Sequence, residues 1–167
     1  MERIHVEEAA PAALGDTPSR RDVSQALGAT DVVIMYYQLG PGEPFSVGYH
    51  AHHTQEEVFY VIEGTAKFDT EQGTVAVEAG EAIWFAPGDF QQGYADRDTS
   101  GGVVALALGA PPGMDETVIV HDCETCGEPK PHDVELDEEA GWERMFCRGC
   151  NNRVVIAPED GEKEDSN

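Results

Sequence analysis

The chain has 167 residues, which is enough for one domain of ordinary size with a small appendage. It contains 33 Asp and Glu against 10 Lys and Arg, and its formal net charge is −23 at pH 7. A surface of that charge repels nucleic acids and anionic membranes, so neither is expected as a partner.

The acidic residues are spread along the whole chain, a composition that resembles the proteins of salt-accumulating halophiles; an ordinary acidic bacterial protein is the alternative. No apolar run approaches the roughly 20 residues needed to span a bilayer, and the N-terminus lacks a signal-peptide pattern. We therefore predict a cytoplasmic protein. In that reducing compartment the four cysteines are expected to bind metal rather than form disulfides.

Residues 1–30 carry prolines, charged clusters and many alanines, and they are predicted to form a lead-in segment with a short helix around 22–27. This segment is expected to pack on the following domain or on a partner subunit. We assign it no chemistry.

The sequence pattern changes at residue 31, after which short apolar runs alternate with Gly and Pro turns. Strands are predicted at 32–39, 58–62, 65–69, 74–78, 82–86, 91–95 and 103–108. Strands of this length and spacing, without a long helical period, indicate an all-β fold, a small antiparallel barrel or jelly roll over residues 31–109. The aromatic residues of these runs, including Trp84, are expected in its core. Tyr36, Tyr37 and Tyr94 are candidates to offer a hydroxyl to a ligand, and the sequence does not select among them.

A cluster of metal-ligand residue types lies between the first two strands. His50 and His52 alternate, so on a strand they project from the same face, and a carboxylate at Glu56 or Glu57 opens the next strand. Two imidazoles and one carboxylate from neighbouring strands form a facial set for a divalent transition metal. The same parity turns His53 away from the site.

Two stretches resemble the motifs of the cupin family. In GYHAHHTQEEVFYVIEG (48–64) the spacing His-x-His-x4-Glu-x6-Gly matches the first motif, and it selects Glu57 over Glu56. In GEAIWFAPGDFQQ (80–92) the glycines match the second motif, and Gln91 stands where the family has its last histidine ligand. Ala86 and Ala95 replace the proline and asparagine of that motif, and Pro44 replaces a glycine of the first.

The resemblance implies a metal site in the barrel made of His50, His52, Glu57 and Gln91, holding Fe, Mn, Ni or Zn. A glutamine oxygen coordinates such metals more weakly than imidazole does. It further implies a homodimer and a metal-dependent enzyme of dioxygenase, isomerase or lyase type that acts on a small molecule. The alternatives are a non-enzymatic small-molecule or metal sensor whose C-terminal segment contacts a protein partner, and a purely structural barrel.

Residues 110–117 are predicted to be a linker, and 118–157 a second small domain. Cys123-x2-Cys126 and Cys147-x2-Cys150 are separated by 20 residues, a spacing typical of a zinc site built from four thiolates. A pair of redox motifs, or substitution by His121 or His132, are the alternatives.

With strands predicted at 133–136 and 142–146, the segment resembles a zinc ribbon. Residues 115–167 carry 16 acidic side chains against 5 basic, which favours a structural or protein-binding role over nucleic-acid binding. The tail, 158–167, is predicted to be disordered.

Overall fold

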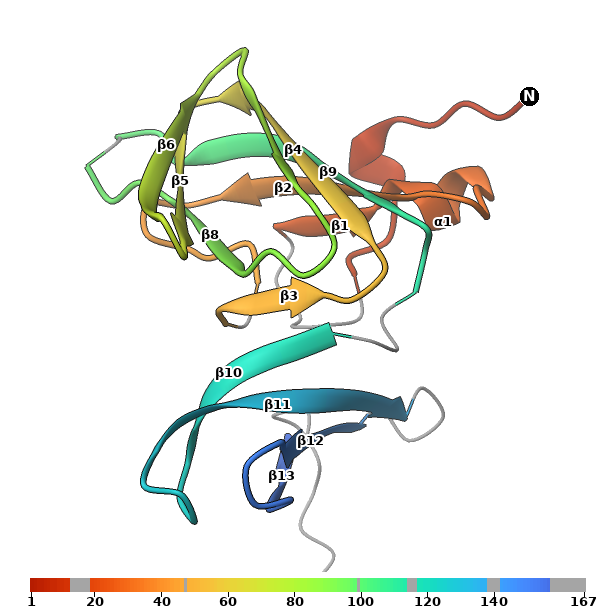
Figure 1. Ribbon diagram of the computed structural model, residues 1–167. Helices are drawn as coiled ribbons and strands as arrows, with labels where there is room; N and C mark the ends of the chain where they lie inside the picture. The colour runs from red at the N-terminus through yellow and green to blue at the C-terminus, as the bar shows by residue number, and fades with distance from the viewer. Residues whose placement is uncertain (13–18, 47, 99, 114–116, 138–141, 157–167) are drawn as a thin grey trace, which may run out of the picture.

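The computed structural model describes residues 1–12, 19–46, 48–98, 100–113, 117–137 and 142–156. Their strands form two antiparallel sheets, so the predicted all-β class is confirmed (Figure 1). The five-stranded sheet runs in the order β1 (Arg20–Asp22), β2 (Val33–Leu39), β9 (Val103–Ala110), β4 (Glu56–Glu63) and β7 (Ala82–Phe85). The eight-stranded sheet runs in the order β13 (Arg153–Ile156), β12 (Trp142–Cys147), β11 (Glu128–Asp137), β10 (Thr117–Cys123), β3 (His50–His52), β8 (Gln91–Ala95), β5 (Thr65–Thr70) and β6 (Gly73–Glu78).

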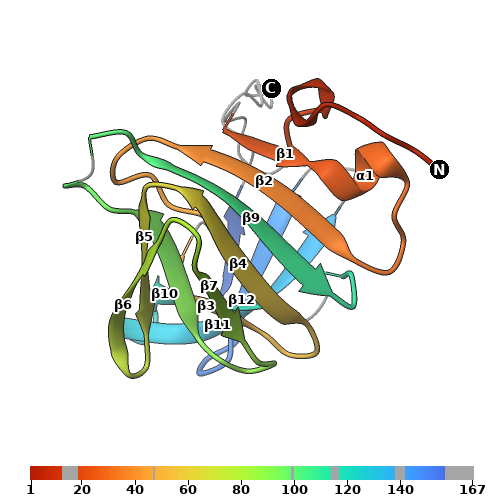
Figure 2. The same cartoon turned by 90° about the horizontal axis from the view of Figure 1, so that it is seen from above.

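The lead-in segment packs against the five-stranded sheet. A 3-10 turn, η1 (Val6–Glu8), precedes β1, and the predicted helix is present as α1 (Val23–Leu27). Asp22 caps α1 by accepting a hydrogen bond from the Gln25 backbone N–H at 2.8 Å. Figure 2 shows β1, β2, β9 and β4 side by side, with α1 at the start of β2. The strand β1 was not predicted, because Arg-Arg-Asp has no apolar alternation.

The core lies between the two sheets and is built around aromatic rings. Phe45, Phe59, Phe68 and Phe85 contact one another with ring centroids 4.9–6.2 Å apart. The prediction that Trp84 lies in the core is wrong, since 57% of the residue's surface is exposed. It lies on the outer face, where its Nε1 donates to Glu56 Oε2 at 3.0 Å.

The C-terminal strands continue the sheet that contains β3, and in Figure 1 they lie beneath it. The two strands predicted here are confirmed within β11 and β12, while β10 and β13 were not predicted. Because β10 pairs directly with β3, strands that precede and follow the predicted linker at 110–117 belong to one sheet. The division into domains 31–109 and 118–157 stays a prediction, and the tail at 158–167 lies outside the described residues. Within the described ranges no helix is long and apolar enough to cross a membrane.

Candidate metal centres

The barrel brings together three of the side chains predicted to form its metal site. One ligand atom from each of His50, His52 and Glu57 lies within 4.8 Å of the others. The two histidines come from β3 and the carboxylate from β4, in the opposite sheet. Glu56 is exposed on the outer face, and His53 is exposed as well, as strand parity predicts.

Each imidazole is held through its Nδ1 atom. His50 Nδ1 lies 2.9 Å from the Gly48 carbonyl oxygen, to which it donates, and His52 Nδ1 lies 3.1 Å from Thr117 Oγ1. A histidine that donates through Nδ1 presents an unprotonated Nε2 atom, the form that binds a metal. In this tautomer each Nε2 atom is free to bind a metal, and His52 Nε2 lies 3.8 Å from Glu57 Oε2.

Gln91 joins this cluster from β8, where it lies opposite His50 in the register and is only 2% exposed. Its Nε2 donates to Glu57 Oε2 at 2.9 Å and lies 3.2 Å from His50 Nε2. Its Oε1 is buried and has no hydrogen-bond partner among the described residues. Turning the amide end for end exchanges the two atoms and brings Oε1 towards the histidine and the carboxylate. In that orientation Oε1, an acceptor without a partner, could bind a metal held by the histidines and the carboxylate.

Burial sets the charge of the cluster. It raises the pKa of Glu57 to about 7, an effect that the hydrogen bond from Gln91 opposes. Burial also lowers the pKa of His52 to about 4, with a smaller contribution from His50, and lowers the pKa of His50. Both imidazoles are therefore neutral at pH 7. Two neutral imidazoles, a carboxylate and an amide oxygen are a donor set that suits a divalent transition metal.

Among the three tyrosines, Tyr37 is the one that faces the interior of the barrel. It is buried, and its pKa is raised by burial and then by the Glu57 carboxylate, so the phenol stays protonated. Tyr94 instead hydrogen-bonds to Asp69 at 3.4 Å, and Tyr36, next to Tyr37 in β2, points to the opposite face.

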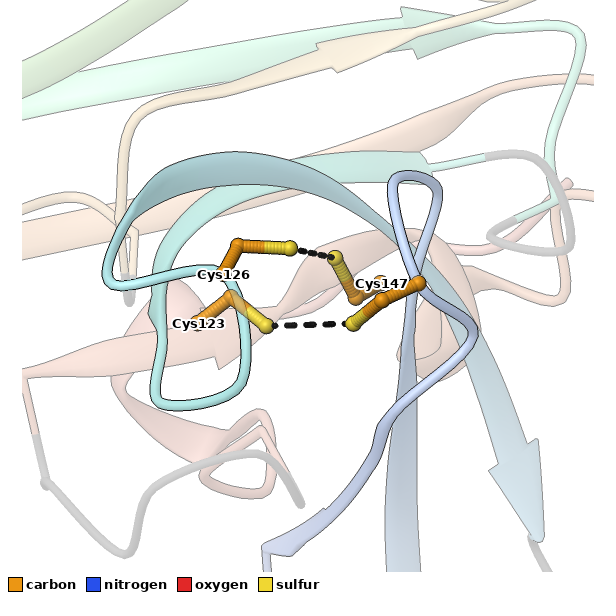
Figure 3. Close-up of side chains that lie close together, drawn as sticks. Cys123, Cys126 and Cys147 are labelled. Atoms are coloured by element: carbon orange, nitrogen blue, oxygen red, sulfur yellow. Dashed lines mark hydrogen bonds between the residues drawn. The ribbon is translucent and has the colours of Figure 1, made fainter.

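The four cysteines form a second cluster at the far end of the larger sheet (Figure 3). Their sulfur atoms all lie within 4.8 Å of one another. Cys123 Sγ is 3.5 Å from Cys150 Sγ, and Cys126 Sγ is 3.9 Å from Cys147 Sγ. Four sulfurs around zinc at 2.3 Å have edges of about 3.8 Å, whereas a disulfide requires about 2.05 Å. The arrangement fits a tetrahedral metal and not two disulfides.

Two matching turns build the cysteine cluster. The Gly127 N–H donates to the Cys123 carbonyl at 2.8 Å, and the Asn151 N–H donates to the Cys147 carbonyl at 2.7 Å. Gly127 and Asn151 both have positive φ, 72° and 60°, a conformation that glycine and asparagine adopt most readily.

Backbone N–H groups also favour the thiolate form of a cysteine. Burial raises the pKa of Cys147, but hydrogen bonds from the backbone N–H groups of Cys150 and Gly149, together with those from the Cys123 and Cys150 side chains, lower it to about 6. The two histidines considered as substitutes, His121 and His132, lie outside the four-sulfur group, with ring centroids 5.7 Å apart.

Two contributors to the barrel site were missed. The Gly48 carbonyl and the Thr117 hydroxyl orient the histidines, although neither belongs to the ligand pattern. Gly48 is two residues from His50, and a short-range turn signal can find such a contact. Thr117 is 65 residues from His52, and no local pattern links the two.

Comparisons with known proteins agree with this architecture. Three solved structures share the fold. A cupin protein from Bacteroides fragilis has 19% identity and a TM-score of 0.54, covering 67% of this chain and 85% of its own. A sugar phosphate isomerase of the cupin superfamily from Silicibacter pomeroyi has 16% identity and a TM-score of 0.54, covering 85% and 78%. A putative sugar phosphate isomerase from Acidithiobacillus ferrooxidans has 18% identity and a TM-score of 0.53, covering 82% and 74%.

At these identities the likeness is one of fold. The comparison with curated proteins gave no match. The family model described as the cupin domain matches residues 35–99, a range that holds the four side chains of the barrel cluster. This part of the chain therefore has a cupin-type fold.

Proposed function

We propose that the barrel binds one divalent transition metal (Fe, Mn, Ni or Zn) through His50, His52, Glu57 and Gln91, and that the protein is a metal-dependent enzyme acting on a small molecule held there. The observation that carries the proposal is the buried Oε1 atom of Gln91, which has no partner among the described residues. The amide of Gln91 lies beside His50 and Glu57, and turning it end for end would bring Oε1 to face them, which supports ligation over a purely structural role.

The metal, when bound, polarises the oxygen atoms of a ligand, which suits dioxygenation, isomerisation or lyase chemistry. The chain's own residues set the surroundings of that ligand. Phe59 and Phe85 make the adjoining wall apolar and exclude water. Tyr37 supplies a buried phenol that stays protonated and can donate a hydrogen bond.

The second candidate is a small-molecule or metal sensor whose C-terminal segment contacts a protein partner. Gln91 favours it, because an amide ligand holds a metal less firmly than an imidazole does. The continuous sheet from β8 to β13 also favours it, since it connects the barrel cluster with the far strands.

A substrate screen separates the two candidates. The protein is depleted of barrel metal, reloaded in turn with Fe²⁺, Mn²⁺, Ni²⁺ and Zn²⁺, and tested for oxygen uptake and for product from hydroxy acids, keto acids and sugar phosphates. Sugar phosphates are included because two of the structures with this fold are described as sugar phosphate isomerases. We expect turnover that His50→Ala abolishes. A ligand that raises Tm in the wild-type protein but not in His50→Ala, without any turnover, supports the sensor instead.

We also propose a structural zinc ion at Cys123, Cys126, Cys147 and Cys150, in a segment that resembles a zinc ribbon. The sulfur–sulfur distances and the two matching turns support it. The high-salt habitat and the cytoplasmic location stay predictions from composition.

We propose in addition that the protein is a homodimer joined through the outer face of the five-stranded sheet. Tyr60, Ile62 and Trp84 are 42%, 40% and 57% exposed on this face, and β9 adds the partly buried Leu106 beside Tyr60. Large apolar side chains gathered on one sheet face are typical of a protein interface. In a chain of net charge −23, the uncharged stretch formed by Tyr60, Ile62 and Leu106 is also a place where two copies can approach with less repulsion.

The dimer is tested with Tyr60→Glu. The added charge lies in the middle of the apolar face, so light scattering is expected to show the mass of one chain for the variant and of two chains for the wild type. Val75→Glu is the matched control, because Val75 is also 42% exposed but lies on β6 of the other sheet. A wild-type protein of one-chain mass contradicts the proposal, as does a Tyr60→Glu variant that keeps the two-chain mass.

A further inference from the structure

We propose that Thr117 is a positioning residue for His52 and that the four-cysteine segment holds it in place, so that metal binding at the cysteines strengthens metal binding in the barrel. The inference rests on the proposed function, because it presupposes a metal at His50, His52 and Glu57. It adds a residue from outside the cupin motifs to the barrel centre and couples two sites that the sequence places in separate domains.

The contact between Thr117 and His52 is direct and partly buried. Thr117 is the first residue of β10 and lies opposite His52 in the register. Its Oγ1 is 3.1 Å from His52 Nδ1, and the threonine is 5% exposed. A group that accepts a hydrogen bond from the far nitrogen of a ligand histidine fixes the orientation of the ring and keeps the other nitrogen free for the metal. Thr117 has the place and the chemistry for this role.

The strand that carries both histidines depends on β10 for its place in the sheet. On one side β3 pairs with β8 through a single residue pair, His50 with Gln91. On the other side it pairs with β10 through three, of which Thr117–His52 and Ile119–His50 involve the histidines. Loss of β10 therefore removes most of the ladder that fixes β3.

The same β10 strand ends in the cysteine cluster. Its seven residues begin at Thr117, against the barrel centre, and end at Cys123, the first of the four cysteines. Residues that pair directly in an antiparallel ladder lie on one face of the sheet. The registers thus place His50, Ile119, His132 and Cys147 in one row across β3, β10, β11 and β12. His132, at the centre of the row, is fully buried.

A second contact joins the cysteine cluster to β3. Arg148 lies between Cys147 and Cys150, and its Nη2 atom is 2.7 Å from Nε2 of His53, the residue after His52. The same guanidinium donates to Asp133 Oδ1 at 2.6 Å. Arg148 is exposed, so we expect it to contribute less than Thr117.

The first test measures Mn²⁺ binding to the zinc-loaded, full-length protein by the electron paramagnetic resonance of free Mn²⁺. Manganese suits this measurement because it prefers nitrogen and oxygen ligands and leaves thiolate-bound zinc in place. Thr117→Val keeps the shape of the side chain and removes the hydroxyl, and is expected to weaken Mn²⁺ binding about tenfold. Thr117→Ser retains the oxygen and is expected to bind like the wild type. Thr74→Val, an exposed threonine on β6, is the control for the substitution itself.

The outcomes separate this inference from the proposed function. Wild-type protein that binds no Mn²⁺ in the barrel overturns the metal centre, and the inference with it. Wild-type binding with an unchanged affinity in Thr117→Val overturns the inference alone.

The second test asks whether the cysteine cluster acts through Thr117. Cys150→Ser replaces the most exposed cysteine and is expected to weaken Mn²⁺ binding at least as much as Thr117→Val. Adding Thr117→Val to it is expected to cost little more, because two changes in one pathway are not additive. Fully additive losses, or a Cys150→Ser variant with wild-type Mn²⁺ affinity, overturn the coupling.

Discussion

Replacing Cys123 with serine is expected to unfold β10–β13 while leaving the aromatic core of the barrel folded. The segment has little apolar interior of its own: among its described side chains Val118, Val134 and Met145 are the buried aliphatic ones outside the cysteines. A small segment of this kind draws its folding free energy from the metal, which supplies about 10–16 kcal/mol in zinc-finger peptides at pH 7. Removing one of four thiolates takes away much of that binding energy.

Amide hydrogen exchange measures this effect by segment. Protection is expected to fall in β10–β12 and to persist in β4, β5 and β9, which pack around Phe59 and Phe68. Thr125→Ser is the matched control, since Thr125 lies in the same turn, between Cys123 and Cys126, and is exposed. Full protection of β10–β12 in Cys123→Ser contradicts a metal-dependent segment.

Glu57→Gln is expected to weaken binding of the barrel metal more than about 100-fold, beyond the effect of losing an outer contact. The substitution preserves shape and removes the one charged ligand of the site. Glu56→Gln is the control, because the neighbouring carboxylate lies on the outer face and bonds to Trp84. The two variants have the same composition and net charge, so surface electrostatics cannot explain a difference between them. Mn²⁺ binding measures both, and equal affinities would exclude Glu57 as a ligand.

Much of the barrel could be predicted from the sequence because its information is local. Alternation of His50 and His52 along one strand predicts a shared face, and the structure places both beside Glu57. Gly and Pro turns mark the ends of β4 to β9 within one or two residues. The short helix lies where it was predicted, between Asp22 and Gly28, which stand at its two caps.

The errors arise where local information ends. Ala82–Phe85 is apolar throughout, so alternation could not distinguish the faces, and Trp84 was assigned to the core although it lies outside. The role of Thr117 depends on the pairing of β3 with β10, two strands that are far apart in the chain. Long-range pairing of this kind has no signature in composition or periodicity. For the same reason the sequence did not reveal that strands on both sides of the predicted linker pair in one sheet.

Metal content per chain tests the central claim most directly. Elemental analysis is made on protein purified without chelator, for the wild type and for His52→Ala. We expect one zinc and close to one further divalent metal ion in the wild type, with only the second ion lost in His52→Ala. A single zinc ion per chain, unchanged by His52→Ala, would contradict a metal centre in the barrel.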